Sequence, residues 1–486
     1  MATDENIIVA IELGSSKITG IAGRKQPDGG IQVLAVAQEP SSTFIRKGRV
    51  FNIEKTKQCL NNIREKLSKD LNKPISQAYV GIGGQGLMTS LHTVQRQLGT
   101  QTGITAEIVD SLLDNNLNTP MGNREILEVI PQEYKVGTQT QVDPIGVLTD
   151  SIEGRFLNVT AVPTLRENID KCFEQVGLKI ANHTISTLAL GDSILSESER
   201  RSGCALVDMG ADTTTVAIYK NNILRQLSVI PLGGSNVTKD IMTLQLERDE
   251  AEQLKLKYGT AYAEFADDEE PSTITLSDGR TVDELTFLEL TEARIEEIIV
   301  NVASQIKRSG YAKDKLLAGI VITGGVAATK NLERAFREHT DFEQFRFAKN
   351  LPITVRLPQG QESIKLGNVN TVIALVDKGT ENCCGTPATA TTPVDLFSGH
   401  EGTSKDRAAE THDRHGQKTD TTTKLHGKES DESEEELTDE KPRKKKQKKT
   451  HDGPTFKERC SKFWQSISRI VTDDSDPNLL DKDKNQ

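Results

Sequence analysis

The residues best suited to chemistry lie in Gly203–Tyr219, which reads GCALVDMGADTTTVAIY. Two short apolar strands flank a turn that carries Asp208, Gly210, Thr213 and Thr214. A carboxylate at the end of one strand, a glycine and then hydroxyls predict a tight hairpin. Such a hairpin offers N–H and hydroxyl groups to phosphate oxygens, while the carboxylate holds a hydrated cation. An ordinary hairpin with Asp and Gly at its turn has the same composition, so this stretch alone leaves both interpretations open.

A related pattern occurs near the N-terminus. Residues 7–23 read IIVAIELGSSKITGIAG, in which an apolar strand leads to Glu12 and is followed by a glycine, two serines and a lysine. Two acid-x-Gly-hydroxyl hairpins about 200 residues apart predict two half-domains that bind a nucleotide's phosphates from both sides of a cleft. The chain thereby resembles the actin, Hsp70 and sugar-kinase superfamily. The resemblance implies an α/β, ribonuclease-H-like two-domain ATPase fold with ATP and Mg²⁺ as cofactors.

The resemblance also gives each hairpin residue an expected role. Glu12 and Asp208 would hold the hydrated Mg²⁺, mostly through water. The residues expected to bind the phosphates are Gly14, Ser15, Ser16, Lys17, Gly210, Thr213, Thr214 and Gly234.

Two departures from the superfamily pattern bear on activity. Glu12 stands where kinases and chaperones use Asp, and its longer side chain would reposition the metal. Ala211 and Asp212 stand where glycines are usual, and Asp212 brings negative charge close to the phosphates unless it points away or binds the metal. We therefore expect a weak ATPase at most, with nucleotide acting mainly as a conformational or polymerisation switch and with no catalytic residue assigned.

Three further segments are candidates for contacts with the nucleotide. Residues 231–236, PLGGSN, open a helix whose N-terminal N–H groups suit an anion. Glu252 and Lys255 share a helix face; the resemblance places them near the ribose and adenine, whereas their spacing alone predicts a solvated ion pair. A buried strand at 318–323 ends in Gly324 and Gly325, whose missing side chains would let adenine lie against the backbone.

Regular elements must hold these residues in place. Strands within 7–23, at 31–37 and at 77–82, with a helix at 53–70, give the β-β-β-α-β order of a first actin-like subdomain. Helices at 186–196 and 368–378 match the pair that crosses between the two domains in this superfamily.

A different pattern interrupts this order at residues 84–162, where we expect an inserted α+β module. The words LEVIPQEY (127–134) and DPIG (143–146) resemble the division-protein FtsA family, which carries such an insert in place of the usual actin subdomain. By itself, IPQEY is a strand ended by a proline. The first domain then resumes at a helix that Thr164 and Glu167 predict to begin with a capping box.

Length and composition indicate how the chain is divided into domains. A length of 486 residues predicts several domains, and the low hydrophobic content of 35% reflects the part after residue 385. The expected organisation is 1–83 and 163–203 as the first actin-like domain, 84–162 as the insert, 204–385 as the second domain, 386–453 as a linker and 454–472 as a helix.

Charge and cysteine content exclude several classes of function. The net charge of −11 argues against nucleic-acid binding by the body of the protein. The six cysteines have no C-x-x-C spacing, so neither a disulfide framework nor a zinc site is expected. With no signal peptide and no apolar run of about 20 residues, we expect a location in the cytosol or at the membrane's cytoplasmic face.

The C-terminal region predicts a tether. Residues 386–453 are too polar to bury a core, which predicts a disordered linker that contains an acidic block at 429–440 and a basic block at 441–449. Residues 456–471, FKERCSKFWQSISRIV, form an amphipathic helix suited to lie on anionic lipid. A nucleic-acid arm for the basic block and a protein-docking helix are the alternatives. The expected lipid contacts are Phe456, Lys457, Lys462, Phe463, Trp464, Ile467 and Ile470.

The FtsA resemblance implies a division protein that tethers FtsZ filaments to the cytoplasmic face of the membrane at the septum. It would also self-associate and recruit later division proteins. A pilus-assembly (PilM-like) actin-like ATPase and a sugar-kinase-like phosphotransferase are the alternatives. The second would need a general base, and none can be assigned besides the phosphate-site acids.

Overall fold

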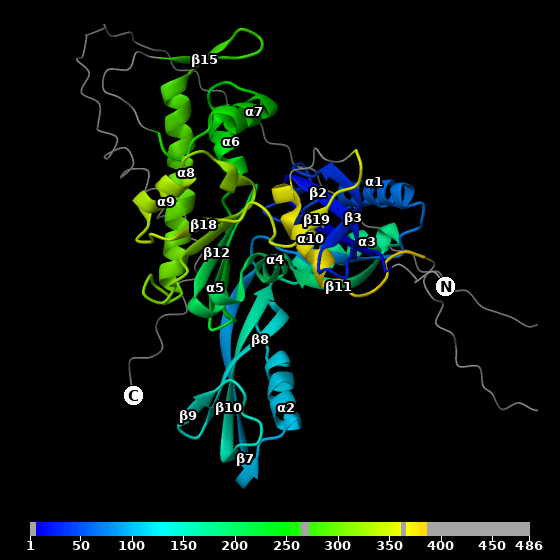
Figure 1. Cartoon of the computed structure of the whole chain (residues 1–486), viewed down its shortest axis with the longest axis vertical. Coiled ribbons are helices and arrows are strands. Elements are labelled where there is room, and N and C mark those ends of the chain that lie inside the picture. The colour runs from blue at the N-terminus through cyan, green and yellow to red at the C-terminus, as the bar shows by residue number, and fades with distance from the viewer. Residues whose placement is uncertain (1–5, 264–271, 361–365, 386–486) are drawn as a thin grey trace, which may run out of the picture. The chain divides into compact units, whose positions relative to one another are not determined.

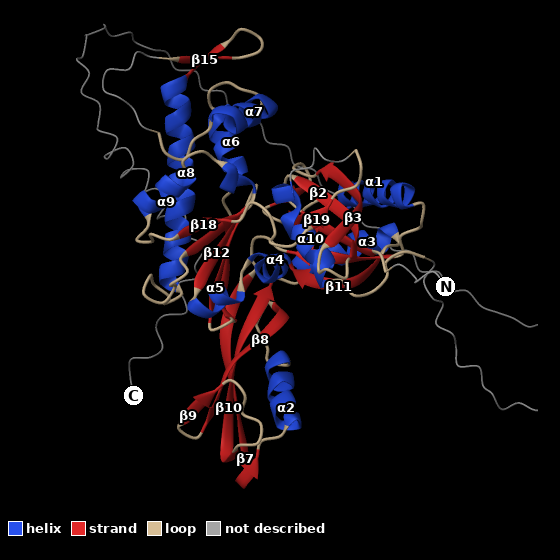
Figure 2. Ribbon diagram, viewed as in Figure 1, coloured by secondary structure: helices blue, strands red, loops and turns tan. Residues whose placement is uncertain are grey.

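The computed structural model describes residues 6–263, 272–360 and 366–385, all within the first of the two units into which the chain divides, Met1–Asp395. The predicted linker at 386–453 and the predicted helix at 454–472 lie outside the described residues. Among the described residues, no helix is long and apolar enough to cross a membrane. Two large sheets and the helices packed on them form the framework (Figures 1 and 2).

The first sheet has six strands in the order β11-β6-β1-β2-β3-β19. Strands β1, β2 and β3 form an antiparallel meander, and β6 adds to β1 in parallel, which requires a crossover. Helix α1 makes this crossover, so the predicted β-β-β-α-β order is confirmed. The bounds are β1 Ile8–Leu13, β2 Lys17–Lys25, β3 Ile31–Pro40, α1 Ile53–Leu71, β6 Gln77–Ile82, β11 Lys179–Ile185 and β19 Val355–Arg356.

Local sequence sets both ends of α1. The side chain of Asn52 accepts a hydrogen bond from the N–H of Lys55 at 3.0 Å, which caps the first turn. Asn72 ends the helix in the left-handed region at φ 51°. Between them, Cys59, Leu60, Ile63 and Leu67 face the core at helical spacing, which packs α1 on β2 and β3.

The second sheet has nine strands in the order β18-β17-β12-β13-β14-β7-β10-β8-β9. The first five strands in this order belong to residues 204–385, the predicted second domain. The last four come from the inserted stretch at 84–162. One residue pair, Ser228 with Met88, joins β14 to β7. The bounds are β7 Met88–Gly103, β8 Glu125–Val136, β9 Gln139–Gln141, β10 Leu148–Ala161, β12 Cys204–Met209, β13 Thr214–Lys220, β14 Ile223–Ile230, β17 Ile320–Thr323 and β18 Phe345–Phe347.

The inserted stretch builds a small core of its own. Helix α2, Ala106–Leu117, lies along β7 and β10 (Figure 1) and buries Leu112 against them. Tyr134 and Phe156 meet edge to face on the same side of the sheet. Strand β10 begins at Leu148, and its ladder with β7 includes residues with polar side chains such as Thr149, Ser151 and Glu153.

The remaining elements are helices around the two sheets and two short hairpins. Their bounds are β4 Ile45–Arg46, β5 Arg49–Val50, α3 Thr164–Val176, α4 Ser186–Ile194, α5 Glu197–Ser202, α6 Gly234–Met242, α7 Arg248–Tyr258, β15 Thr273–Thr275, β16 Thr281–Asp283, α8 Glu284–Arg308, the 3₁₀ turn η1 Gly325–Ala328, α9 Leu332–His339, η2 Leu366–Val369 and α10 Asn370–Lys378.

The predicted capping box at the start of α3 is wrong. The capping position is Pro163, whose carbonyl accepts from the N–H of Glu167 at 3.0 Å. Thr164 is already helical, and its hydroxyl accepts a hydrogen bond from Arg49 instead of capping the helix. The preceding proline fixes φ near its helical value and so starts the helix one residue earlier than the threonine signal indicates.

Helices α4 and α10 pack against each other, as predicted for the pair between the domains (Figure 1). Helix α10 also contacts β1, β2 and β6 of the first sheet, and α4 contacts β11 of the first sheet and β13 of the second. Gly191 of α4 allows this approach, because a Cβ there would lie 2.5 Å from the hydroxyl of Tyr219 on β13. The two sheets are therefore connected through one packed helix pair.

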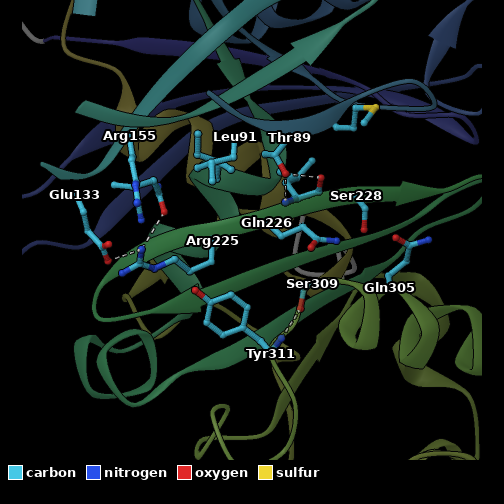
Figure 3. A pocket seen from close by; sticks show the side chains of 14 residues that line it. Thr89, Leu91, Glu133, Arg155, Arg225, Gln226, Ser228, Gln305, Ser309 and Tyr311 are labelled. Atoms are coloured by element: carbon cyan, nitrogen blue, oxygen red, sulfur yellow. Dashed lines mark hydrogen bonds and ion pairs between the residues drawn. The ribbon is translucent and has the colours of Figure 1, made fainter. Parts of the chain in front are cut away.

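The IPQEY motif, residues 130–134, holds the insert to β14. The Gln132 side chain donates to the carbonyl of Leu224 at 3.0 Å, and Arg225 donates to Gln132 at 3.1 Å and to Glu133 at 3.3 Å. Figure 3 shows Arg225 reaching Glu133 across a cleft of about 430 Å³, with Arg155 nearby. Strand β8 continues past Pro131 to Val136, so the proline does not end the strand, and the side chains of Gln132 and Glu133 join the insert to β14.

Arg225→Ala should destabilise the protein far more than Arg155→Ala, although both arginines line the same cleft. The Arg225 side chain is 10% exposed, and its loss removes the donor to the Gln132 side-chain oxygen and to the Glu133 carboxylate, for an expected cost of about 2–3 kcal/mol. The Arg155 side chain is 41% exposed and pairs with Glu153, so its loss should cost less than about 1 kcal/mol. Urea unfolding of both variants measures the difference, and equal midpoints would contradict this role of IPQEY.

Candidate functional site

The two sheets each carry a carboxylate near the carboxyl end of a strand that has a parallel neighbour. Glu12 of β1 lies beside Gly81 of β6, and Asp208 of β12 lies beside Thr323 of β17. Burial and the charge of Asp208 raise the pKa of Glu12 to about 7, although Lys17 and a hydrogen bond with Thr371 act in the opposite direction. Burial raises the pKa of Asp208 to about 6. Two partly buried acids thus face each other, an arrangement that a hydrated divalent cation would relieve.

The first hairpin turn, between β1 and β2, is tight. A Cβ on Gly14 would lie 2.7 Å from the carbonyl oxygen of Lys17, and the carbonyl of Gly14 accepts from the hydroxyl of Ser41 at 2.6 Å. Ser15 is buried and its hydroxyl accepts from the N–H of Gly48 at 2.8 Å, whereas Ser16 is exposed. Burial lowers the pKa of the Lys17 ammonium, and the Glu12 carboxylate counteracts this. The turn therefore offers hydroxyls and a cation beside Glu12.

The second hairpin turn, between β12 and β13, is closed by a hydrogen bond of 2.8 Å from the N–H of Gly210 to the carbonyl of Thr213. Thr213 is partly exposed at the turn. The structure places Thr214 differently from the prediction, because this side chain is fully buried and its hydroxyl donates to the carbonyl of Leu232 at 2.9 Å. Thr214 thus supports the hairpin from behind, and Thr213 is the threonine at the turn.

The start of α6 also differs from the prediction of an anion site. The N–H of Gly234 donates to the carbonyl of Gly210 at 3.0 Å, and the N–H of Ser235 donates to that of Ala211 at 2.7 Å. A Cβ on Gly233 would lie 2.5 Å from the same Gly210 oxygen. The glycines at this helix start therefore allow α6 to pack directly on the second hairpin, and its first N–H groups already have partners.

The residues predicted to contact the adenosine lie around Gly234. Lys255 donates to the carbonyl of Gly234 at 3.1 Å and pairs with Glu252 at 2.6 Å, so the expected ion pair is present and partly buried. On the other side, a Cβ on Gly234 would lie 3.1 Å from a methyl group of Val326, one residue beyond Gly325.

Gly324 must be a glycine for two reasons. Its φ is +92°, and a Cβ would lie 2.4 Å from the carbonyl oxygen of Met209 and 2.6 Å from a carboxylate oxygen of Asp208. Gly325, in contrast, has open space around the position of a Cβ. The paired glycines therefore bring the η1 backbone against Asp208 on one side and leave room on the other.

The sequence pattern did not reveal the turn between β4 and β5. Lys47 and Gly48 both have positive φ, 51° and 74°, as in the type I′ turn of a two-residue hairpin. The N–H of Lys47 donates to a carboxylate oxygen of Asp212 at 3.0 Å, and that of Gly48 donates to Ser15. The signal was a Lys-Gly pair between two short apolar segments, but strands of two residues are too short to show periodicity.

These residues fit a polyphosphate with a divalent cation. Two facing acids, glycine turns with no room for a Cβ, and hydroxyls at both turns converge at the ends of β1 and β12. The residues that the sequence predicted there are Glu12, Asp208, Gly14, Ser15, Ser16, Lys17, Gly210 and Thr213, whereas Gly324 was predicted for the adenosine. Thr214 and Gly234 instead support the second turn from within.

Known proteins with similar sequences are division proteins. The family model described as cell division protein FtsA matches residues 205–391, and that described as the SHS2 domain inserted in FTSA matches residues 84–160. The cell division protein FtsA of Porphyromonas gingivalis is 30% identical over 347 residues, which cover 70% of this chain and 72% of that protein. FtsA of Escherichia coli strain K12 is 27% identical over 398 residues, 78% of this chain and 92% of that protein.

A solved structure shows the same fold at low sequence identity. A chain of the PilM–PilN type IV pilus biogenesis complex superposes with a TM-score of 0.53 at 13% identity, covering 77% of this chain and 98% of that chain. The two sheets, the helix pair between them and this likeness define an actin-like ATPase fold with an inserted module. By its sequence relatives, the chain belongs to the FtsA family of cell division proteins.

Glu12→Gln should stabilise the ligand-free protein and change how its stability depends on pH. A carboxyl whose pKa rises from 4.5 to about 7 on folding contributes stability that is present below pH 4.5 and is lost as the pH rises to 7. The amide does not titrate, so the variant should gain on the wild type between these limits, by about 1–3 kcal/mol at pH 7.5. Thermal unfolding at pH 5, 6 and 7.5 without nucleotide or metal measures this gain.

The exposed Glu65→Gln change on α1 is the matched control, with the same change of charge away from the site. A gain that is independent of pH, or one that Glu65→Gln reproduces, would contradict the raised pKa of Glu12, which burial and the charge of Asp208 cause.

Proposed function

We propose that this protein binds ATP with Mg²⁺ between the Glu12 and Asp208 hairpins and tethers FtsZ filaments to the cytoplasmic face of the membrane at the division septum. It self-associates and recruits later division proteins. Membership of the FtsA family carries the proposal. The facing carboxylates and glycine turns support it, since both halves of the chain supply groups of the kind that bind phosphate and metal.

The chain's own groups account for nucleotide binding in the following way. Glu12 and Asp208 would hold a hydrated Mg²⁺, which would supply positive charge against the phosphate oxygens. Ser15, Thr213 and Lys17 offer a hydroxyl, a second hydroxyl and a cation from the two turns. Gly324 and Gly325 would flank the base, and the open space around Gly325 leaves room on that side of the backbone. Because these groups come from both halves, ATP favours the closed arrangement through differential contacts with it.

The membrane contact is assigned to residues 454–472, with 386–453 as the linker. Both lie outside the described residues, so sequence supports this part of the proposal. An amphipathic helix with basic residues beside its apolar face binds an anionic surface without spanning it. The proposed linker follows Gly385, whose N–H donates to the carbonyl of Pro74 at 3.0 Å. Pro74 lies three residues before β6, so the described part of the chain ends beside the start of that strand.

One observation favours a second candidate. The PilM chain, from a type IV pilus biogenesis complex, shares the fold, so a pilus-assembly role is the alternative. Its identity of 13% is well below the 30% of the division protein. The PilM-like role predicts no affinity for FtsZ.

Removal of residues 454–486 should release the protein from vesicles that contain anionic lipid. Because the apolar and basic residues of the tether would be lost, most of the bound protein should move to the supernatant in a co-pelleting assay. FtsZ added to the full-length protein should pellet with these vesicles, and should stay in the supernatant with the truncated protein. The substitution of Trp464 and Phe463 by Glu in the full chain is the matched control for truncation.

Two outcomes would refute parts of this proposal. Unchanged pelleting of the truncated protein would refute the tether, and vesicle binding without FtsZ recruitment would favour the PilM-like alternative.

ATP turnover should be slow. Glu12 takes the place of the usual Asp, and nucleotide is proposed to act as a conformational switch. We therefore expect phosphate release well below about 10 s⁻¹, the median for enzymes. Steady-state phosphate release with saturating ATP and Mg²⁺ measures this rate. A rate near that median would favour the sugar-kinase-like reading.

A further inference from the structure

The β4–β5 turn connects the two phosphate hairpins. Its two consecutive N–H groups, on Lys47 and Gly48, donate to side chains of opposite halves of the site: Asp212 at 3.0 Å and Ser15 at 2.8 Å. Asp212 is 165 residues from Lys47 and belongs to the β12–β13 turn. A single short turn thus contacts both sides of the candidate nucleotide site.

The turn itself is fixed to the first half of the chain. The N–H of Gln85 donates to the carbonyl of Lys47 at 2.8 Å. Gly48 packs so closely on Gly84 that a Cβ would lie 2.4 Å from the Gly84 Cα. Since these contacts hold the position of the two N–H groups, a ligand that needs them must displace their present acceptors.

The two acceptors differ in how they respond to a phosphate. The Ser15 hydroxyl can accept from Gly48 and still donate its own hydrogen to a phosphate oxygen. The Asp212 carboxylate only accepts, and its charge repels a phosphate. The turn also carries Arg46, Lys47 and Arg49 within four residues, so it attracts anions in general.

We propose that Asp212 stands in for a phosphate oxygen in the ligand-free protein: it occupies the N–H of Lys47 and competes with bound nucleotide for this group. The inference rests on the proposed nucleotide function and deepens it by adding the Lys47–Gly48 turn as a third phosphate-contacting loop. Nucleotide binding moves Asp212 away from the turn and leaves Ser15 in place. Asp212 thereby lowers nucleotide affinity and makes the β4–β5 turn a sensor of phosphate.

Asp212→Asn and Asp212→Ala test the competition. The amide keeps an acceptor for Lys47 but loses the charge, and alanine removes both. Calorimetric titration with ATP–Mg²⁺ should show three- to tenfold tighter binding for Asp212→Asn and at least as much for Asp212→Ala, because a larger fraction of molecules has the Lys47 N–H free. Asp114→Asn on α2, an exposed position in the insert, changes the net charge equally and should leave the affinity unchanged.

Amide hydrogen exchange distinguishes competition with phosphate from a purely structural role of Asp212. In ligand-free Asp212→Ala, the amides of residues 45–50 should exchange faster than in the wild type, and addition of ATP–Mg²⁺ should restore their protection. Restored protection would mean that a phosphate oxygen accepts the hydrogen bond from the Lys47 N–H in place of the Asp212 carboxylate.

The outcomes separate this inference from the function on which it rests. If the wild type binds ATP–Mg²⁺ and both Asp212 variants bind equally or more weakly, or if ATP does not restore protection at 45–50, the competition is refuted and nucleotide binding stands. If no variant binds ATP–Mg²⁺, Asp212→Asn included, both are refuted. Binding of ATP–Mg²⁺ by both Asp212 variants but not by the wild type would support the competition strongly.

Discussion

The constraint on which the site depends is the meeting of two like charges at the ends of β1 and β12. Glu12 and Asp208 are brought together because each sits at the carboxyl end of a strand with a parallel neighbour, and α4 and α10 pack between the sheets that contain them. Burial raises both pKa values, and the charge of Asp208 adds to the rise at Glu12. The fold keeps an unfavourable pair in place, which is typical of a site that binds a cation.

Glycines make this proximity possible, and only some of them are turn residues. Gly324, Gly233 and Gly191 lie where a Cβ would meet a neighbouring atom at 2.4 or 2.5 Å, so each lets one element pack on the backbone or ring of another. The first brings η1 to Asp208, the second brings α6 to the second hairpin, and the third brings α4 to β13. The site is therefore as much a product of close packing between elements as of the two hairpins themselves.

The sequence predicted those elements of the fold that depend on local, recurring residue patterns. The hairpins of β1–β2 and β12–β13, the β-β-β-α-β order and the α4–α10 pair follow from apolar runs that end in characteristic residues. The partners of individual polar groups could not be predicted, since they depend on which element packs nearby. Gly234 was expected to bind an anion, but its N–H faces the Gly210 carbonyl. The β4–β5 turn was missed because its strands have two residues each.

The ligand-free site satisfies its own polar groups. Carbonyls of the second hairpin accept from the first N–H groups of α6, Glu252 neutralises Lys255, and Asp212 accepts from Lys47. Where a protein donor is already paired, binding exchanges one hydrogen bond for another, so the net free energy per contact is small. A site of this kind would suit a ligand that shifts an equilibrium between arrangements better than one held for rapid chemistry. The facing acids are the exception, because they lack a counter-charge strong enough to keep their pKa values at the ordinary level, and a cation therefore contributes most at this point.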